Sequence, residues 1–576
     1  MSLLPLGELT PHTPRRFLPA TLDLGNWDAV KPWVDRLEAQ GRAASTVAEL
    51  EAWLIDQGEV IAAIDEERAR RYIAMTCHTA DPDAEKAYLA FVEGIDPELK
   101  PRAFALARLY LEHPLRSTLP KKRYAVLDRN RALEVELYRD ENVPLETEEA
   151  KVSQQYQKLS GSLTVQFQGS ERTLVQMGRF QEETDRSLRE SAWRTVSDRW
   201  VTESDAFDGL FDGLIQIRSR IAANAGFKDY RDYAFRARGR FDYTPADCEQ
   251  FHDAIESEVM PVLRGLQEDR RRVMGLASLR PWDTAVDPMN RPPLRPFTDT
   301  RALEEGSQRI FDRLDDTLAA DFRLMRDQRL LDLDNRKGKA PGGYQYTLSE
   351  SRVPFIFMNA VGQQRDLETL LHEAGHAFHA LACRNEPLQA YREVPIEFCE
   401  VASMSMELLA AEGLGEFYGS DELRRARRTH LEGIVGVFPW IATIDAFQHW
   451  IYTHPGHSVG DRQAAWLRLM DRFGGNIDWT GLEPVRANRW QRQLHLFLHP
   501  FYYVEYGIAQ LGALQVWANA KKDPKRALAD YRAGLALGGS RPLPQLFAAA
   551  GCRFDFSRET LKPLLALVQE ELATLD

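Results

Sequence analysis

Two histidines four residues apart, in the stretch LLHEAGHAFHAL at 370–381, have the type and spacing of a metal site. Residues at i and i+4 lie on one face of a helix, so His372 and His376 can direct imidazole nitrogens at one ion. Glu373 lies about 100° further round and can reach a water molecule without being a ligand. The pattern predicts two zinc ligands and a general base for a hydrolysis in which zinc activates water and polarises a carbonyl group.

The alternative is a buried helix that carries two hydrogen-bonded histidines. With 13 histidines in 576 residues, chance would produce this pattern in about 0.02 chains of this length, which favours the metal site. His379 lies on the same face but one turn further along, so we expect it to support the site rather than bind the ion. A third histidine ten residues after the first is absent, because position 382 is alanine.

A carboxylate from a second helix can complete the three protein ligands that catalytic zinc usually has. Pro395 can start a helix whose residues Glu397, Glu400 and Glu407 share one face. Carboxylates on an apolar helix are costly to bury unless they are paired or bind a metal. Glu400, which follows His376 by 24 residues and lies between apolar neighbours, is the best candidate. A solvent-facing stripe is the alternative, above all for Glu397.

The elements that must position these residues are mostly helical. Apolar residues recur at spacings of three and four over 28–113, 183–224 and 245–275, between charged faces. Thr244 fits an N-cap and Pro245 fits the first helical position after it. The sequence therefore predicts long amphipathic helices on both sides of the histidine motif.

Residues 338–360 break the helical pattern with a Gly-Gly pair, aromatic residues and a short apolar run. We expect a strand over 353–359, and since Pro354 lacks an N–H, we expect it at the edge of a sheet. An edge strand can bind an extended peptide through backbone hydrogen bonds. The glycines would let the adjacent loop close over a substrate; a plain connecting loop is the alternative.

Composition excludes several classes of partner. The net charge of −13 and the pI of about 5.6 argue against nucleic acid. Five cysteines without CxxC pairing suggest reduced thiols in the cytoplasm, although a thiolate ligand from Cys383 or Cys399 stays open. We find no secretory signal and no apolar run near the ~20 residues that span a bilayer. We expect a cytoplasmic protein without a membrane partner.

Five short motifs follow one another in one order. They are APGGYQY at 340–346, VPFIFMN at 353–359, HEAGHAFH at 372–379, EVAS at 400–403 and QLHLFLHPFYYVEYG at 493–507. Together they resemble the zinc oligopeptidase family of thimet oligopeptidase and oligoendopeptidase F, and they are closest to the oligoendopeptidase F branch. The resemblance covers about residues 180–570.

The resemblance implies a mainly α-helical, two-lobed metallopeptidase. It would have a deep central substrate channel and a small β-sheet next to the HExxH helix. Residues 1–180 would form an N-terminal helical region and part of the channel wall. Residues 181–576 would form the catalytic domain.

The resemblance also assigns a role to individual residues. One Zn²⁺ would be held by His372, His376 and Glu400, with Glu373 as the base. The catalytic residues His495, Tyr503 and Tyr506 would contact the substrate carbonyl, with His499 as a rival for His495 and Tyr502 as a rival for Tyr503. The residues expected to bind substrate are Gly343, Tyr344, Phe355, Phe357 and Tyr502.

The leading hypothesis is a zinc-dependent endopeptidase that hydrolyses internal bonds of short, unstructured peptides. A dipeptidyl carboxypeptidase would use the same zinc site but anchor a free C-terminal carboxylate. From another class, a catalytically inactive peptide-binding scaffold is the alternative, although such a protein would not need Glu373. The sequence leaves open whether the chain forms a homo-oligomer and whether another divalent metal replaces zinc.

Overall fold

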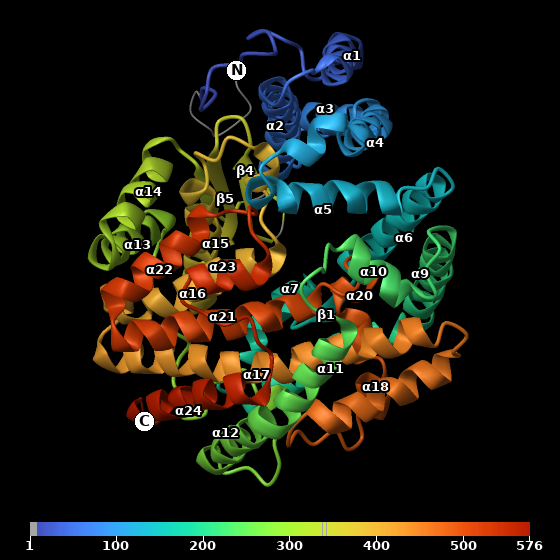
Figure 1. The fold of residues 1–576 in the computed structure, drawn as a ribbon. Coiled ribbons are helices and arrows are strands. Elements are labelled where there is room, and N and C mark those ends of the chain that lie inside the picture. Colours follow the sequence, from blue (N-terminus) through green and yellow to red (C-terminus); the bar gives the residue numbers. More distant parts are fainter. Residues whose placement is uncertain (1–8, 337, 341, 576) are drawn as a thin grey trace. The chain divides into compact units, whose positions relative to one another are not determined.

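The computed structural model describes residues 9–336, 338–340 and 342–575, and it is mainly helical as predicted (Figure 1). Each of its two compact units is assembled from three segments of the chain. Unit 1 comprises residues up to 136, 295–423 and 509–554; unit 2 comprises 137–294, 424–508 and 555 onward. The boundary near residue 180, the two lobes and the channel stay predictions. Among the described residues, no helix combines the length and apolarity needed to cross a bilayer.

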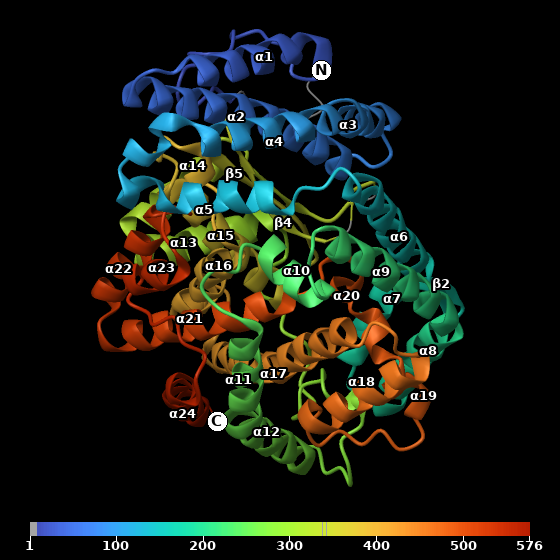
Figure 2. The same cartoon turned by 45° about the vertical axis from the view of Figure 1, so that its right-hand side comes forward.

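The N-terminal part of unit 1 is a stack of helices (Figure 2). A capping box starts α2, because Thr46 accepts from the backbone N–H of Glu49 and the Glu49 carboxylate accepts from the N–H of Thr46. Trp53, Phe91 and Tyr110 are buried in the core of this stack. The helices are α1 (Trp27–Ala43), α2 (Val47–Cys77), α3 (Pro82–Gly94), α4 (Asp96–Glu112) and α5 (Lys121–Leu137).

The other elements of unit 1 surround the histidine motif. Two helices precede the sheet, and two further helices follow α21, whose C-terminal part belongs to this unit. The elements are α13 (Thr300–Leu314), α14 (Asp316–Asp327), β3 (Leu331–Asp334), β4 (Tyr344–Leu348), β5 (Val353–Ala360), α15 (Gln364–Ala382), α16 (Ile396–Ala410), α21 (Tyr503–Lys522), α22 (Pro524–Ala536) and α23 (Leu543–Ala549).

The small sheet of unit 1 has the order β3-β5-β4, so the expectation that 353–359 is an edge strand is wrong. β5 is central, parallel to β3 and antiparallel to β4. The N–H of Ile356 points toward β3, since it donates to the carbonyl of Leu330 at 2.9 Å. The nitrogen of Pro354 therefore faces the same side, two residues before the pairing with β3 begins. No ladder hydrogen bond is lost, and the proline is tolerated.

The same alternation determines which backbone groups β4 leaves at the open edge. Tyr344 and Tyr346 face Phe357 and Phe355 in the register and bond to β5. The backbone groups of Gln345 and Thr347 therefore point away from the sheet. The edge strand predicted for peptide binding is β4 rather than β5.

A buried ion pair holds the connection between β3 and β4. The Lys339 ammonium, whose side chain is fully buried, donates to an Asp332 carboxylate oxygen at 2.9 Å and to the carbonyls of Asp332, Asp334 and Met358. Arg336 donates to both Asp332 oxygens, at 2.6 and 2.7 Å. Burial alone would raise the pKa of Asp332, but Arg336, Cys77 and Lys339 outweigh it and hold the pKa well below its usual range.

Helices α15 and α16 pack closely together, and α15 also covers β5. The apolar residues of α15 recur at helical spacing and are buried, including Leu367, Leu371 and Phe378. Pro395 precedes α16, as expected. The two helices come close together at Gly375, where a Cβ would lie 2.6 Å from Ser403 Cα and 2.7 Å from the Ala402 oxygen. Only glycine permits this spacing between the two helices.

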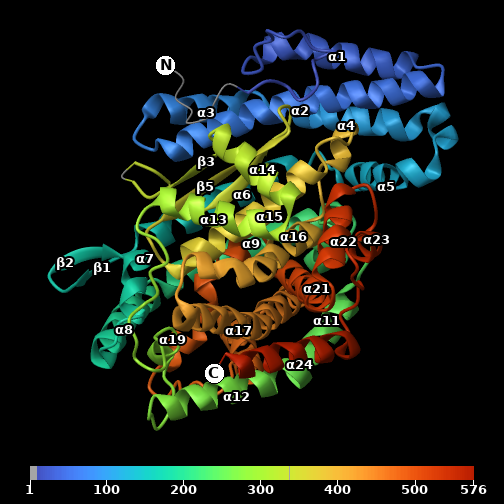
Figure 3. The same cartoon turned by 90° about the vertical axis from the view of Figure 1, so that its left-hand side faces the viewer.

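Unit 2 is also helical, with one hairpin that lies beside α7 and α8 (Figure 3). Thr244 caps α11 and Pro245 is its first residue, as predicted. α17 lies in this unit from residue 424, as does α21 up to residue 508. The elements are α6 (Asn142–Ser162), β1 (Thr164–Phe167), β2 (Ser170–Thr173), α7 (Leu174–Met177), α8 (Arg186–Thr202), α9 (Ser204–Asn224), α10 (Tyr230–Ala237), α11 (Pro245–Ala254), α12 (Met260–Val273), α17 (Ser420–Thr453), α18 (Val459–Phe473), α19 (Glu483–Ala487), α20 (Leu494–Leu498) and α24 (Arg558–Thr574).

Candidate active site

Three ligand-type side chains meet where α15 packs on α16. One ligand atom from each of His372, His376 and Glu400 lies within 4.8 Å of the other two. Oε2 of Glu400 is 3.4 Å from Nε2 of His372 and 3.7 Å from Nε2 of His376. Ligand atoms around a tetrahedral Zn²⁺ lie about 3.3 Å apart, given bonds of about 2.0 Å. The donor set and its spacing fit such an ion.

A hydrogen bond to a neighbouring group fixes the orientation of each histidine ring. Nδ1 of His372 donates a hydrogen bond to a carboxylate oxygen of Glu407 at 2.6 Å, and this contact turns Nε2 toward Glu400, where an ion would bind. The His376 ring hydrogen-bonds the backbone carbonyl of Cys399. The sequence placed Glu407 on the same face as Glu400 but did not predict its contact with His372. That contact depends on how closely the two helices pack.

The Glu400 carboxylate is buried, with 6% of the residue exposed. The Ser403 hydroxyl donates to its Oε2 at 3.0 Å. Burial would raise the pKa of Glu400, but His376, His372 and Ser403 outweigh it and lower the pKa to about 2. For His372 the signs are reversed. Burial would lower its pKa, but Glu400 and Glu407 outweigh burial and raise the pKa well above its usual value. A divalent cation bound between these side chains would stabilise the buried carboxylate in the place of a histidine proton.

Glu373 lies next to these ligands on α15 without joining them. Its carboxylate accepts a hydrogen bond from the backbone N–H of Gln345, one of the groups that β4 turns toward the open edge. Burial and the Glu400 charge raise the pKa of Glu373 to about 7, although His372 and Gln345 oppose the shift. A carboxylate poised near neutral pH is suited to accept and return a proton. Sequence analysis gave no sign of the contact with Gln345.

The other residues considered as ligands near the motif lie outside the ligand group. His379 is 2% exposed, lies outside the ligand group and packs its ring against Phe398. Burial lowers its pKa to about 3. Cys383 and Cys399 also lie outside the group, so the thiolate alternative is not supported. Glu397 is 5% exposed, which rules out the solvent-facing alternative for this residue.

The residues expected to bind substrate near the sheet have contrasting environments. Phe355 and Phe357 are fully buried, so their side chains lie in the core rather than at a surface. Tyr344 stacks on Phe357 with ring centroids 4.8 Å apart, and its hydroxyl is 2.7 Å from that of Thr76. Gly343 has the Phe357 carbonyl close by. Substrate binding by these four residues stays a prediction. The contacts with Phe357 and Thr76 hold the Tyr344 side chain in place, so it is not free to fold over a substrate.

The histidine and tyrosines of 493–507 form a cluster within unit 2. The His495 ring lies 5.0 Å from that of Tyr503, 5.7 Å from that of Tyr502 and 5.9 Å from that of Tyr506. The rings of His495 and His499 are 6.1 Å apart. These distances show that the predicted residues are neighbours, but they do not separate His495 from its rival or identify the tyrosine that acts.

A glutamine sets the tautomer of His495. Trp440 Nε1, which can only donate, lies 3.1 Å from the Gln493 amide oxygen. The Gln493 amide nitrogen therefore faces His495 and donates to Nδ1 at 2.8 Å. A neutral His495 must then carry its proton on Nε2, where it can serve as a hydrogen-bond donor. Neither Trp440 nor Gln493 was singled out by sequence, because their contact requires two separate segments.

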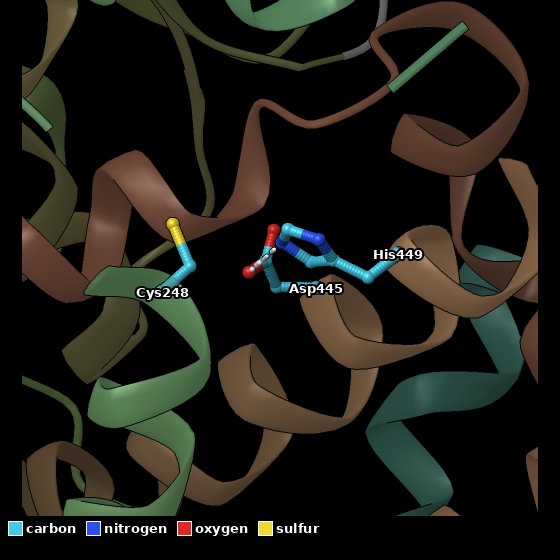
Figure 4. Close-up of side chains that lie close together, drawn as sticks. All are labelled: Cys248, Asp445 and His449. Atoms are coloured by element: carbon cyan, nitrogen blue, oxygen red, sulfur yellow. Dashed lines mark ion pairs between the residues drawn. The ribbon is translucent and has the colours of Figure 1, made fainter. Parts of the chain in front are cut away.

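A second group of ligand-type residues in unit 2 lies between α11 and α17. Atoms of Cys248, Asp445 and His449 lie within 4.8 Å of one another, and all three residues are buried (Figure 4). The Asp445 carboxylate is 2.9 Å from Nε2 of His252 and 3.2 Å from Nε2 of His449. Burial would raise the pKa of Asp445, but these histidines hold it well below its usual range. The contacts link the two helices in the interior of the unit.

Comparison with known proteins identifies the family. The model of peptidase family M3 matches residues 179–564, more than half of the chain. The chain belongs to peptidase family M3. The matched region contains the HExxH helix, α16 and the His495 cluster, which confirms the resemblance seen in the five motifs.

The similar proteins point to the oligoendopeptidase F branch. An oligoendopeptidase F homolog of Borreliella burgdorferi is 24% identical over 349 residues, which are 56% of this chain and 57% of that protein. The chromosomal oligoendopeptidase F of Lactococcus lactis subsp. cremoris is 22% identical over 256 residues, 44% of this chain and 41% of that protein. These matches span about half the length of the curated relatives.

A solved structure of PZ peptidase A with an inhibitor is 27% identical to this chain and superposes with a TM-score of 0.89. The superposition covers 97% of this chain and 100% of that one. The mainly helical fold with a small sheet next to the HExxH helix is therefore shared.

Proposed function

We propose that this protein is a zinc-dependent endopeptidase that hydrolyses internal bonds of short, unstructured peptides. The observation that carries the proposal is the geometry of His372, His376 and Glu400, with the Glu373 carboxylate beside them. Membership of peptidase family M3 supports hydrolysis of peptides. The names of the similar proteins support oligopeptides as the substrate class.

His372, His376 and Glu400 would hold one Zn²⁺, with Glu407 fixing the orientation of His372. The bound ion would supply a Lewis acid that makes water nucleophilic and polarises the scissile carbonyl. Glu373 takes the proton released when water attacks and then delivers it to the leaving amine. The N–H of Gln345 keeps the carboxylate oriented during both transfers.

The tetrahedral oxyanion needs hydrogen-bond donors of its own. The motif match assigns this task to His495, Tyr503 and Tyr506. The tautomer set by Gln493 gives His495 a donor at Nε2, in agreement with that role. Tyr502 would contact the substrate. These assignments rest on the resemblance together with the local geometry of the cluster.

The open edge of β4 would align the peptide. Since Gln345 uses its N–H on Glu373, the groups left for an added strand are the carbonyl of Gln345 and the backbone of Thr347. Backbone pairing of this kind is indifferent to most side chains, which suits a broad oligopeptidase. A dipeptidyl carboxypeptidase is the second candidate, because the same edge would serve a peptide with a free C-terminus.

The test is mass spectrometry of products from a pool of peptides blocked at both ends, with and without a chelator. The proposal expects cleavage at internal bonds, loss of cleavage with the chelator and recovery with added Zn²⁺. An exopeptidase that requires a free carboxylate would leave the blocked peptides intact. Cleavage that persists after complete metal removal would refute the metal-dependent mechanism.

A further inference from the structure

A cavity of about 300 Å³ in unit 1 opens beside the metal ligands. Its lining includes His376 and the β4 edge residues Gln345 and Thr347. The C-terminal half of α15 and the segment after it complete the wall. The cavity therefore adjoins both the proposed reaction centre and the strand along which a peptide would lie.

The lining of this cavity is strongly cationic. Arg352, Arg384 and Arg392 contribute to it, and we call it the arginine pocket. The lining contains one carboxylate, Glu393, whose Oε1 accepts from the Gln389 amide at 2.7 Å. The guanidinium groups therefore exceed the carboxylates by two charges.

The carboxylates that act on these arginines, Glu386 and Glu393, are hydrogen-bonded to other side chains. Among the residues that the structure describes, none of the three forms an ion pair with a carboxylate. Arg352 donates to the Arg384 carbonyl, and Arg392 donates to the Glu386 carbonyl, each at 2.8 Å. The nearby Glu386 carboxylate is already held by Arg123 through both oxygens. Several guanidinium N–H groups are left to bind a ligand.

The lowered pKa values of two of these arginines also favour the binding of an anion. Burial lowers the pKa of Arg352. Burial and the like charge of Arg352 lower the pKa of Arg392 to about 10. Arg352 lowers the pKa of Arg392 in spite of the opposing charges of Glu386 and Glu393, and an entering anion would relieve the repulsion between the two arginines.

A buried imidazole adds an independent sign of a ligand. His379 lines the pocket and is 2% exposed, yet neither ring nitrogen has a hydrogen-bond partner. A buried polar group without a partner destabilises the fold unless a ligand or water satisfies it. A polar ligand in the pocket can satisfy a nitrogen of His379. The hydroxyls of Thr347 and Ser349, which share the lining, offer further hydrogen-bonding groups to the same ligand.

We propose that the arginine pocket binds a carboxylate of the peptide substrate and thereby selects where the chain is cut. The carboxylate comes either from an acidic side chain near the scissile bond or from a free C-terminus. A peptide added along β4 passes the pocket, and alternate side chains of an extended chain point to the same face. Guanidinium groups bind carboxylates in a bidentate, charge-assisted manner. This inference rests on the proposed peptidase function.

The first experiment measures kcat/KM for end-blocked peptides that carry Glu or Gln at one position, scanned on both sides of the scissile bond. A second arm compares neutral peptides with a free or an amidated C-terminus. Charge-assisted hydrogen bonds contribute about 1.5–3 kcal/mol. We therefore expect about a ten-fold or greater preference for the charged member in one arm, and that arm identifies the source of the carboxylate.

Variants locate the preference in the pocket. Arg392→Gln and Arg352→Gln should each reduce the charged-to-neutral ratio about ten-fold, whereas Arg392→Lys should retain part of it. Arg301→Gln is the matched control, because that arginine lies on α13 with a side chain that is 86% exposed. It should leave both the ratio and the activity unchanged. A ratio near one in both arms, or a ratio that survives both glutamine variants, would overturn the proposal.

A binding measurement separates failure of the pocket from failure of the proposed function. Fluorescence anisotropy with the Glu373→Gln variant reports affinity for labelled Glu and Gln peptides without turnover. Suppose that wild-type protein cleaves no peptide, but the Glu373→Gln variant still prefers the charged peptide and loses this preference when Arg392→Gln is added. That result would support carboxylate binding by the pocket and refute the peptidase function. Cleavage of neutral peptides with no charge preference in either assay refutes the pocket alone.

Discussion

Replacement of Gly375 by alanine should separate the two helices that carry the metal ligands. An ideal Cβ at this position lies 2.6 Å from Ser403 Cα, about 0.8 Å short of the 3.4 Å at which ordinary contact begins. The obstacles are backbone atoms of α16, which cannot rotate away as a side chain could. The helices must therefore move apart by nearly that distance. Overpacking of this kind costs about 1–3 kcal/mol of stability.

The displacement matters because Glu400 lies on α16, less than one turn from the point of contact. Metal sites tolerate deviations of about 0.2 Å in ligand distance, well below the expected shift. We expect Gly375→Ala to weaken Zn²⁺ binding by about 10–100-fold, the range seen when the support of a ligand is lost. Competition with a chromophoric chelator measures the affinity, and urea denaturation measures the stability.

The matched control is Gly433→Ala, in the middle of α17, where an added Cβ meets nothing within 4 Å. That change should be neutral or should stabilise by up to about 1 kcal/mol through helix propensity. Wild-type zinc affinity together with wild-type stability in Gly375→Ala would refute the reasoning that close packing of α15 on α16 determines the site.

Three further predictions follow from contacts around the site and the sheet. Glu407→Ala should lower Zn²⁺ affinity about 10–100-fold, because Nδ1 of His372 loses its acceptor; Glu407→Gln should lose less, and equal affinity in all three proteins would contradict the role. Tyr506→Phe should lower kcat about 10²–10³-fold at unchanged metal content if its hydroxyl stabilises the oxyanion, whereas unchanged kcat would remove it from that role. Asp332→Asn should cost about 3–5 kcal/mol, because it leaves the buried Lys339 without its carboxylate. Since the folded-state pKa of Asp332 is depressed, its stabilisation is present above the unfolded-state pKa of about 3.9 and is lost as the pH falls below it; urea midpoints should therefore converge for wild type and variant in strong acid, and a constant difference would contradict this account.

Local spacing was enough to predict much of the metal centre. The i, i+4 pair His372 and His376 follows from helix geometry, and Glu400 was the best of the three carboxylates on an otherwise apolar helix; the structure brings the three residues together. Gly375 lies between the two histidines and permits the close approach of α16. These features depend on one or two helices whose periodicity is strong.

What the sequence did not predict depends on contacts between distant segments. Pro354 indicated an edge strand, because it cannot donate a backbone hydrogen bond. β3 pairs with β5 only from Ile356 onward, after the proline, so β5 can be the central strand. The contact between Trp440 and Gln493, which orients His495, joins residues 53 positions apart. The arginine pocket gathers Arg352, Arg384 and Arg392 from a strand end and the segment that follows α15. No short-range pattern marks such a combination.

The most direct test of the central claim is to replace the Glu373 carboxylate while leaving the metal ligands intact. The account predicts that Glu373→Gln binds one Zn²⁺ with wild-type affinity, because Glu373 is not a ligand. The same variant should lose cleavage of an end-blocked peptide, because the amide cannot accept and return the proton. Cleavage at the wild-type rate, with zinc bound, would contradict the proposed mechanism.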